Sequence, residues 1–215
     1  FDPDDESRYV DGFEEILTSI VLDQDIPLRM TLLGFYGHCR WMFGPEKALF
    51  NFAAEPDLIH EVMEFWGDFL IENTKRLLES SVPVDFLTIW EDMSYKGGSL
   101  ISPKHFREFI LPQYKRVTSF LKKNGVKKIL VDSDGDINDL LPLLIEGGID
   151  AMYPFEVAAD MDIRVLKKQY PDFIFMGNID KRAVADGEDA LKREMELKMP
   201  SVRGGGYIPR FDHWV

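Results

Sequence analysis

The chain of 215 residues is 45% hydrophobic and 29% charged, and it contains a single cysteine. This composition predicts one globular domain and excludes collagen-like, disulfide-scaffold and disordered proteins. The net charge of −13 disfavours nucleic acids and anionic membranes as partners, because phosphates and acidic lipids repel an acidic protein. No apolar run approaches the roughly 20 residues of a membrane span and no signal-peptide pattern is present, so we expect a cytoplasmic protein. Because the chain starts at Phe1 and stops soon after a strand-like segment, we expect it to be part of a longer protein.

Strand-like and helix-like segments alternate along the chain, which is typical of βα units around a parallel sheet. The segments expected to be strands are 27–35, 86–91, 128–132, 149–153, 173–177 and 207–209. The segments expected to be helices are 57–80, 103–124, 138–146, 163–170 and 188–199, with Pro112 kinking the second. Six strands are too few for a closed barrel of eight. We therefore predict a single α/β domain over 1–215, a (β/α)8 TIM barrel without its first βα units and its last helix. A doubly wound open sheet is the alternative.

Polar residues follow the predicted strands, where a parallel barrel holds its active site. They are Glu91 and Asp92, then Asp132, Asp134 and Asp136, then Tyr153 and Glu156, then Asn178 and Asp180, then Asp212 and His213. Asp136 and Asp180 can also be explained as helix N-caps. Asp132 and Asp134 are different, because two carboxylates one residue apart repel each other unless they share a cation or a proton.

Three further motifs are weaker candidates for a functional site. The acidic run that starts at Asp132 has Ile137 and Leu143 where an EF-hand calcium loop needs Gly and Glu, which excludes an EF-hand calcium site there. The glycines 204–206 precede a strand, without the helix of a phosphate-binding loop, and we expect them to allow close backbone packing. His38 and Cys39 are expected in a loop after the first strand, with a structural or substrate-lining role.

The order of motifs along the chain resembles the uroporphyrinogen decarboxylase superfamily. The motifs are Glu91-Asp92, Gly97-Gly98-Ser99-Leu100-Ile101-Ser102-Pro103, Phe106, Phe109, Leu111-Pro112, Asp134-Gly135, Gly177-Asn178-Ile179-Asp180, Gly205-Gly206-Tyr207-Ile208 and Asp212-His213. The resemblance extends from about residue 27 onward and implies a (β/α)8 barrel.

Two branches of this superfamily imply two reactions. The decarboxylases convert uroporphyrinogen to coproporphyrinogen without a cofactor, but this chain has Trp90-Glu91-Asp92 where they have Phe-(Asp/Glu)-Ser, and Tyr207 where they have His. The corrinoid-dependent methyltransferases hold zinc with a His-x-Cys pair and a later Cys. Those positions match Asp132, Asp134 and His213 here, which excludes thiolate ligands and leaves carboxylate and imidazole for zinc or another divalent metal.

The leading hypothesis is an enzyme that performs methyl transfer involving a corrinoid as co-substrate, with a metal-activated substrate. The expected catalytic residues are Asp134, Asp132 and Glu91, and the expected metal ligands are Asp132, Asp134 and His213. The expected substrate-binding residues are Asp92, Tyr153, Glu156, Asn178, Tyr36 and Arg210. The expected partners are a small-molecule methyl donor or tetrapyrrole, a corrinoid protein, and a second copy of the chain in a homodimer.

Two other functions are also compatible with the sequence. The first is uroporphyrinogen decarboxylation, a lyase reaction of porphyrin biosynthesis, in which basic side chains such as Arg40 and Arg210 bind the tetrapyrrole and no cofactor is needed. The second is a non-catalytic barrel that binds a corrinoid protein.

Overall fold

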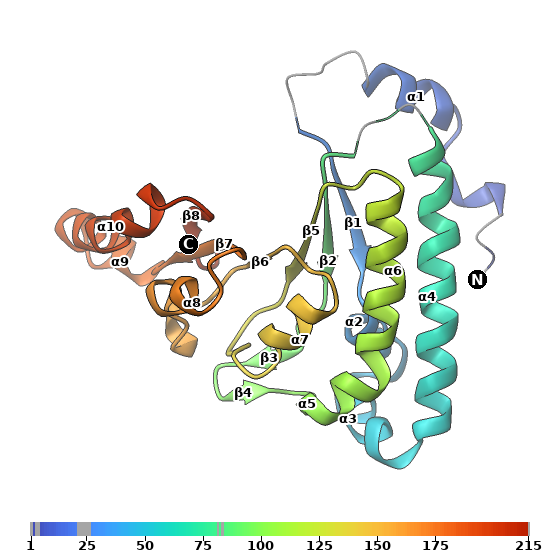
Figure 1. Cartoon of the computed structure of the whole chain (residues 1–215), viewed down its shortest axis with the longest axis horizontal. Coiled ribbons are helices and arrows are strands. Elements are labelled where there is room, and N and C mark those ends of the chain that lie inside the picture. The colour runs from blue at the N-terminus through green and yellow to red at the C-terminus, as the bar shows by residue number, and fades with distance from the viewer. Residues whose placement is uncertain (1, 3–4, 21–26, 81, 83, 215) are drawn as a thin grey trace.

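The computed structural model describes residues 2, 5–20, 27–80, 82 and 84–214, and its frame is a six-stranded sheet (Figure 1). The strands, in their order across the sheet, are β1 (Arg29–Leu33), β2 (Phe86–Trp90), β5 (Lys128–Asp132), β6 (Ala151–Tyr153), β7 (Ile174–Ile179) and β8 (Tyr207–Phe211). Every neighbouring pair is parallel. Strand order follows chain order, as in a barrel, whereas a doubly wound sheet reverses its order at a switch point. The prediction of a partial (β/α) barrel is therefore confirmed, with β1 and β8 as its two edges among the described residues.

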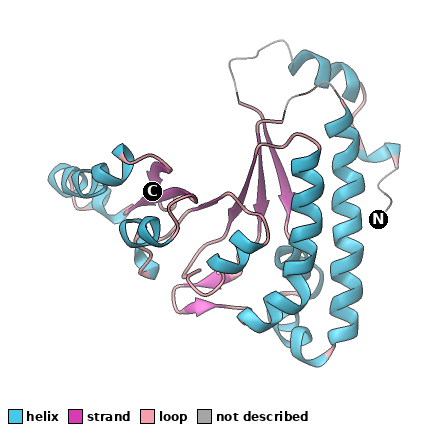
Figure 2. Cartoon of the chain, viewed as in Figure 1, coloured by secondary structure: helices cyan, strands magenta, loops and turns pink. Residues whose placement is uncertain are grey.

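Helices lie beside the strands of the sheet, as Figure 2 shows. The first group consists of η1 (Glu6–Arg8), α1 (Phe13–Ile20), α2 (Phe35–Phe43), α3 (Pro45–Ala54) and α4 (Pro56–Glu79). The second group consists of α5 (Pro103–His105), the π-helical turn η2 (Phe106–Ile110), α6 (Leu111–Lys123), α7 (Leu141–Glu146), η3 (Val157–Ala159), α8 (Ile163–Gln169), α9 (Arg182–Ala185) and α10 (Glu188–Arg203). A short antiparallel hairpin, β3 (Ser94–Tyr95) and β4 (Gly98–Ser99), follows β2. None of the helices in the described ranges combines the length and apolarity needed to cross a membrane.

The predicted loop after the first strand needs correction. His38 and Cys39 lie in the helix α2, not in a loop, and both are buried. The sequence predicts a kink at Pro112, and the helix is irregular there: the π-helical turn η2 ends immediately before α6, and Pro112 lies in the first turn of α6. Proline cannot donate the hydrogen bond that a continuous α-helix would need there.

The glycines before β8 do not provide the close packing expected of them. Gly205 and Gly206 have φ of 69° and 65°, and a Cβ at Gly205 would meet no atom within 4 Å. The left-handed backbone conformation therefore explains these glycines.

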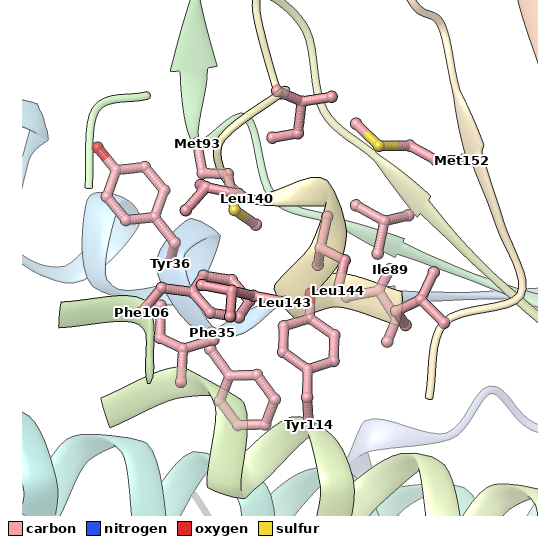
Figure 3. Close-up of a cluster of buried hydrophobic side chains, with 14 of the residues drawn as sticks. Phe35, Tyr36, Ile89, Met93, Phe106, Tyr114, Leu140, Leu143, Leu144 and Met152 are labelled. Carbon is pink, nitrogen blue, oxygen red and sulfur yellow. The ribbon is translucent and has the colours of Figure 1, made fainter. Parts of the chain in front are cut away.

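Alternation along each strand divides the core in two. In β5, Ile129 and Val131 belong to the large cluster between sheet and helices, which Figure 3 shows around Tyr114. Leu130 belongs to a separate cluster inside the barrel, together with Ala151 and Tyr153. Inward-facing side chains at the last position of a strand therefore point into the mouth of the barrel.

Candidate active site at the mouth of the barrel

A pocket of about 490 Å³ lies at the mouth of the barrel. Its lining residues are Arg29, Trp90, Asp92, Asp132, Asp134, Tyr153, Pro154, Arg210, Phe211, Asp212, His213 and Trp214. Trp90, Asp132 and Tyr153 are register partners at the last positions of β2, β5 and β6. Residues in register on parallel strands point to the same side, so these three side chains enter the pocket together.

The pocket gathers six of the residues predicted for the site. They are Asp92, Asp132, Asp134, Tyr153, Arg210 and His213. Their convergence follows from the parallel sheet, whose strands all end at the same mouth. Glu91, Glu156, Asn178 and Tyr36 are not among the lining residues.

Three carboxyl groups of the pocket are held in surroundings that disfavour their charge. Burial, together with the nearby carboxylates of Asp92, Glu156 and Asp132, raises the pKa of Asp134 to about 6, although His213 lowers it. Burial also raises the pKa of Asp92, although Arg40 lies 3.4 Å from its Oδ2. Burial likewise raises the pKa of Asp132, although the latter accepts a hydrogen bond from the Tyr153 hydroxyl. A group that titrates near pH 6 can give or take a proton close to neutral pH.

Asp134 has a basic partner in His213. The Nε2 atom of His213 lies 3.7 Å from Asp134 Oδ2, and both side chains are partly exposed to the pocket. The pair follows two strands that are far apart in the sequence, β5 and β8. A carboxyl and an imidazole at this separation can pass a proton to or from a bound substrate.

The buried Asp212 fixes the backbone that carries His213. Its Oδ2 accepts a hydrogen bond from Val157 N (2.9 Å), its Oδ1 accepts one from Lys181 N (3.1 Å), and its own N–H donates to Ile179 O (2.9 Å). The carboxylate thus ties the end of β8 to the segments that follow β6 and β7. Its place beside His213 was the only signal of this role in the sequence.

Glu91 lies outside the pocket, so the structure does not bring it together with the predicted catalytic residues Asp132 and Asp134. It is fully buried, and its carboxylate accepts hydrogen bonds from Phe35 N and Gly37 N, both at 2.9 Å, and from the Tyr114 hydroxyl at 2.5 Å. Burial raises the pKa of Glu91 to about 7, although these hydrogen bonds lower it. A carboxylate at the start of a helix satisfies N–H groups that have no partner within the helix. Glu91 therefore anchors α2, which carries Arg40, on the end of β2.

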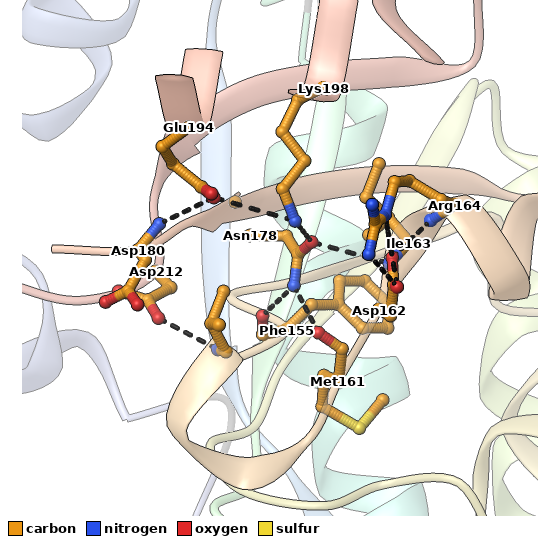
Figure 4. A network of polar contacts seen from close by, with 12 residues as sticks. Phe155, Met161, Asp162, Ile163, Arg164, Asn178, Asp180, Glu194, Lys198 and Asp212 are labelled. Atoms are coloured by element: carbon orange, nitrogen blue, oxygen red, sulfur yellow. Dashed lines mark hydrogen bonds and ion pairs between the residues drawn. The ribbon is translucent and has the colours of Figure 1, made fainter. Parts of the chain in front are cut away.

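Asn178, predicted to bind substrate, also lies outside the pocket, and its side chain holds neighbouring segments together. It is fully buried, with its Nδ2 donating to Phe155 O (2.7 Å) and Met161 O (2.6 Å) (Figure 4). Its Oδ1 accepts from the buried Lys198 ammonium at 2.6 Å and from Ile163 N at 3.4 Å. These contacts use both amide hydrogens and both acceptor sites of the side chain, and none is left for a substrate.

The other two predicted substrate contacts also lie outside the pocket. Tyr36 is fully buried in the core, and its ring stacks on that of Phe52. Glu156 holds a loop: its Oε2 accepts from Gly135 N at 3.0 Å, and its Oε1 lies 3.7 Å from the Lys181 ammonium.

The two predicted helix caps do stabilise backbone turns. Asp136 accepts a hydrogen bond from Asn138 N at 3.0 Å, although α7 begins only at residue 141. Asp180 accepts one from Arg182 N, the first residue of α9, at 2.9 Å.

The predicted metal ligands do not form a metal site. Within the ranges that the structure describes, no three His, Cys, Asp or Glu side chains are arranged so that they could hold a metal ion. Asp134 and His213 are in contact, but the carboxylate of Asp132 bonds the Tyr153 hydroxyl instead of completing the set. Among the described residues, the donor set therefore does not fit a metal held by three protein ligands.

The chain is similar to known proteins in its sequence and in its fold. The sequence model of the family described as uroporphyrinogen decarboxylase (URO-D) matches residues 8–213. No curated protein matches the chain. Among solved structures, a methyltransferase from Methanosarcina mazei is similar, with a TM-score of 0.67 and 16% sequence identity. The match covers 93% of this chain and 58% of that methyltransferase, so this chain spans little more than half its length. At this identity, the likeness establishes a shared fold.

Proposed function

Because the chain belongs to the uroporphyrinogen decarboxylase family, we propose that it catalyses methyl transfer between a small methylated substrate and a corrinoid co-substrate. The observation that carries this proposal is the balance of charge in the pocket. Four aspartates line it against two arginines and one histidine. Uroporphyrinogen, with its eight carboxylates, calls for an excess of positive charge at the binding site. The fold shared with a methyltransferase supports the same choice.

The chemistry requires orientation more than covalent help from the protein. The methyl carbon forms a bond to the acceptor while its bond to the donor atom breaks, and the breaking bond leaves its electron pair on the donor atom. Holding donor and acceptor in line can supply a large part of the rate enhancement. The donor atom then takes up a proton, which the Asp134–His213 pair can deliver.

A corrinoid would supply the cobalt that gives or accepts the methyl group. The rim of the pocket suits a large planar molecule, because flat aromatic side chains are exposed there. Trp214 lines the pocket and is 85% exposed, and Trp41, which is 72% exposed, has its ring 6.0 Å from that of the pocket residue Trp90. Exposed aromatic groups of this kind are enriched where proteins bind large partners.

Two assays on the purified protein test the proposal. In the first, the protein is mixed with cob(I)alamin and methyl donors, and methylcobalamin formation is followed by absorbance. In the second, it is mixed with uroporphyrinogen, and the products are separated by their number of carboxylates. Methylcobalamin without decarboxylation supports methyl transfer, and a porphyrinogen with fewer carboxylates would overturn it. No turnover in either assay, together with tight binding of a corrinoid protein, would favour the non-catalytic alternative.

A further inference from the structure

Two arginines of the pocket have no carboxylate partner. Arg29, at the first position of β1, and Arg210, on β8, both line the pocket, and neither forms an ion pair with a described residue. Both guanidinium groups act on the same region, because their charges lower the pKa of Asp132. The Cζ of Arg210 lies 5.3 Å from the ring centroid of Tyr153. Two guanidinium groups that line one pocket without an ion pair to a described residue are suited to binding a carboxylate.

The carboxyl groups that follow β2 and β5 have different surroundings. Asp134 is influenced by the negative charges of Asp92, Glu156 and Asp132, with His213 as a partly exposed partner. Three negative groups near one carboxyl disfavour its ionised form, and a positive charge on a ligand would relieve this repulsion. This part of the pocket is therefore complementary to a cation.

Aromatic rings line the same pocket and favour a cation of a particular kind. Trp90, Tyr153, Phe211 and Trp214 contribute to the wall. The Cζ of Arg40 lies 5.9 Å from the Trp90 ring centroid, so this ring already faces a cation. Trp214 is largely exposed and its ring is open to a ligand. Aromatic walls beside carboxylates bind methylated onium groups, whose charge is spread over methyl groups that cannot donate strong hydrogen bonds.

We propose that the pocket binds a zwitterionic methylated substrate, an onium group joined to a carboxylate. Arg29 and Arg210 hold the carboxylate, while Asp134 and the ring of Trp214 hold the quaternary ammonium or sulfonium group. A simple anion would face Asp92 and Asp134 without compensation, and a simple cation would leave both arginines unpaired. This inference rests on the proposed methyl transfer only for the fate of the methyl group. When that methyl leaves an ammonium, the bonding electron pair stays on nitrogen, and the neutral amine takes up a proton.

Binding of three matched probes tests the proposal without any need for turnover. Trimethylglycine carries both charges, 3,3-dimethylbutanoate replaces its ammonium by a neutral carbon centre, and tetramethylammonium lacks the carboxylate. Affinities are measured by calorimetry and by tryptophan fluorescence. We expect trimethylglycine to bind at least about tenfold more tightly than either of the others, the ratio that corresponds to one good cation–π or charge-assisted contact.

Variants assign the two halves of the site. Arg210→Gln should weaken trimethylglycine and 3,3-dimethylbutanoate about tenfold and leave tetramethylammonium unchanged, whereas Asp134→Asn should weaken trimethylglycine and tetramethylammonium only. The matched controls are Arg203→Gln at the end of α10 and Asp11→Asn before α1, both exposed and away from the pocket, and neither should change any affinity.

Other results separate this inference from the proposed function. Equal affinity for all three probes, or no binding of trimethylglycine, would overturn the zwitterion proposal even if a neutral methyl donor is turned over. Selective binding of trimethylglycine without methyl transfer to cob(I)alamin would support the zwitterion site and count against the proposed methyl transfer.

Discussion

Replacing Glu91 by glutamine should remove a strong pH dependence from the stability of the fold. The wild-type carboxyl is fully buried at the start of α2, and burial raises its pKa from the usual 4.5 to about 7. Glutamine has a similar shape but cannot ionise. The comparison of the two proteins therefore isolates the cost of the buried charge.

The sign and size of the effect follow from proton linkage. Between pH 4.5 and about 7 the folded state keeps a proton on Glu91 that the unfolded state has lost. The stabilisation by this proton is complete below pH 4.5 and is lost as the pH rises through 7. A pKa difference of this size corresponds to about 3 kcal/mol of unfolding free energy, and most of the loss falls between about pH 5 and pH 8.

Urea unfolding measured at several pH values across this range tests the effect. The free energy of unfolding of the wild type should fall relative to that of Glu91→Gln by about 2–3 kcal/mol as the pH rises. Glu108→Gln, an exposed carboxyl on η2, is the control and should follow the wild type at every pH. Parallel curves for wild type and Glu91→Gln would show that the hydrogen bonds from Phe35, Gly37 and Tyr114 fully offset burial, and the reasoning would be wrong.

Two further substitutions test the structural network behind the pocket by chemical denaturation. Asn178→Ala should destabilise the fold by about 3–5 kcal/mol. The substitution leaves the carbonyls of Phe155 and Met161 without this hydrogen bond and removes the nearest oxygen from the Lys198 ammonium. A loss of unfolding free energy under about 1 kcal/mol would contradict this prediction. Gly177→Ala should lower the free energy of unfolding by about 3 kcal/mol or more. The φ of Gly177 is 110°, and the added Cβ would clash with the carbonyl oxygen of Pro154. An unchanged denaturation midpoint would exclude that clash.

The sheet could be predicted from the sequence because its strands are short apolar runs between clear turn signals. β5 matches its predicted bounds, Lys128–Asp132, because a run of three apolar residues, 129–131, lies between two lysines and an aspartate. Helix α2 was missed. Its sequence contains aromatic residues and Gly37, which are poor local evidence for a helix. The helix begins there because Glu91, 54 residues later, accepts the N–H of Gly37, and a contact of that range leaves no local pattern.

The candidate site was predictable in its place but only partly in its members. The ends of the predicted strands identified the correct end of the barrel, because the six strands of the main sheet are parallel. Trp90 and Asp92 line the pocket, so Glu91 between them points to the other side of the sheet. This orientation of Glu91 could have been predicted from the alternation of side chains along β2. The role of Asn178 could not be inferred in this way, because it depends on Lys198 in α10 and on loops that only the fold brings together.

The central claim, that the mouth pocket is the active site, is tested most directly at Asp134. Asp134→Ala removes the carboxyl that faces His213 in the pocket, and it breaks no buried backbone hydrogen bond. Methyl transfer to cob(I)alamin and urea unfolding are measured on the same preparations of wild type and variant. Our account predicts that kcat/KM falls about 100-fold or more while the unfolding free energy changes by less than about 1 kcal/mol. Transfer at the wild-type rate by a folded Asp134→Ala protein would contradict it.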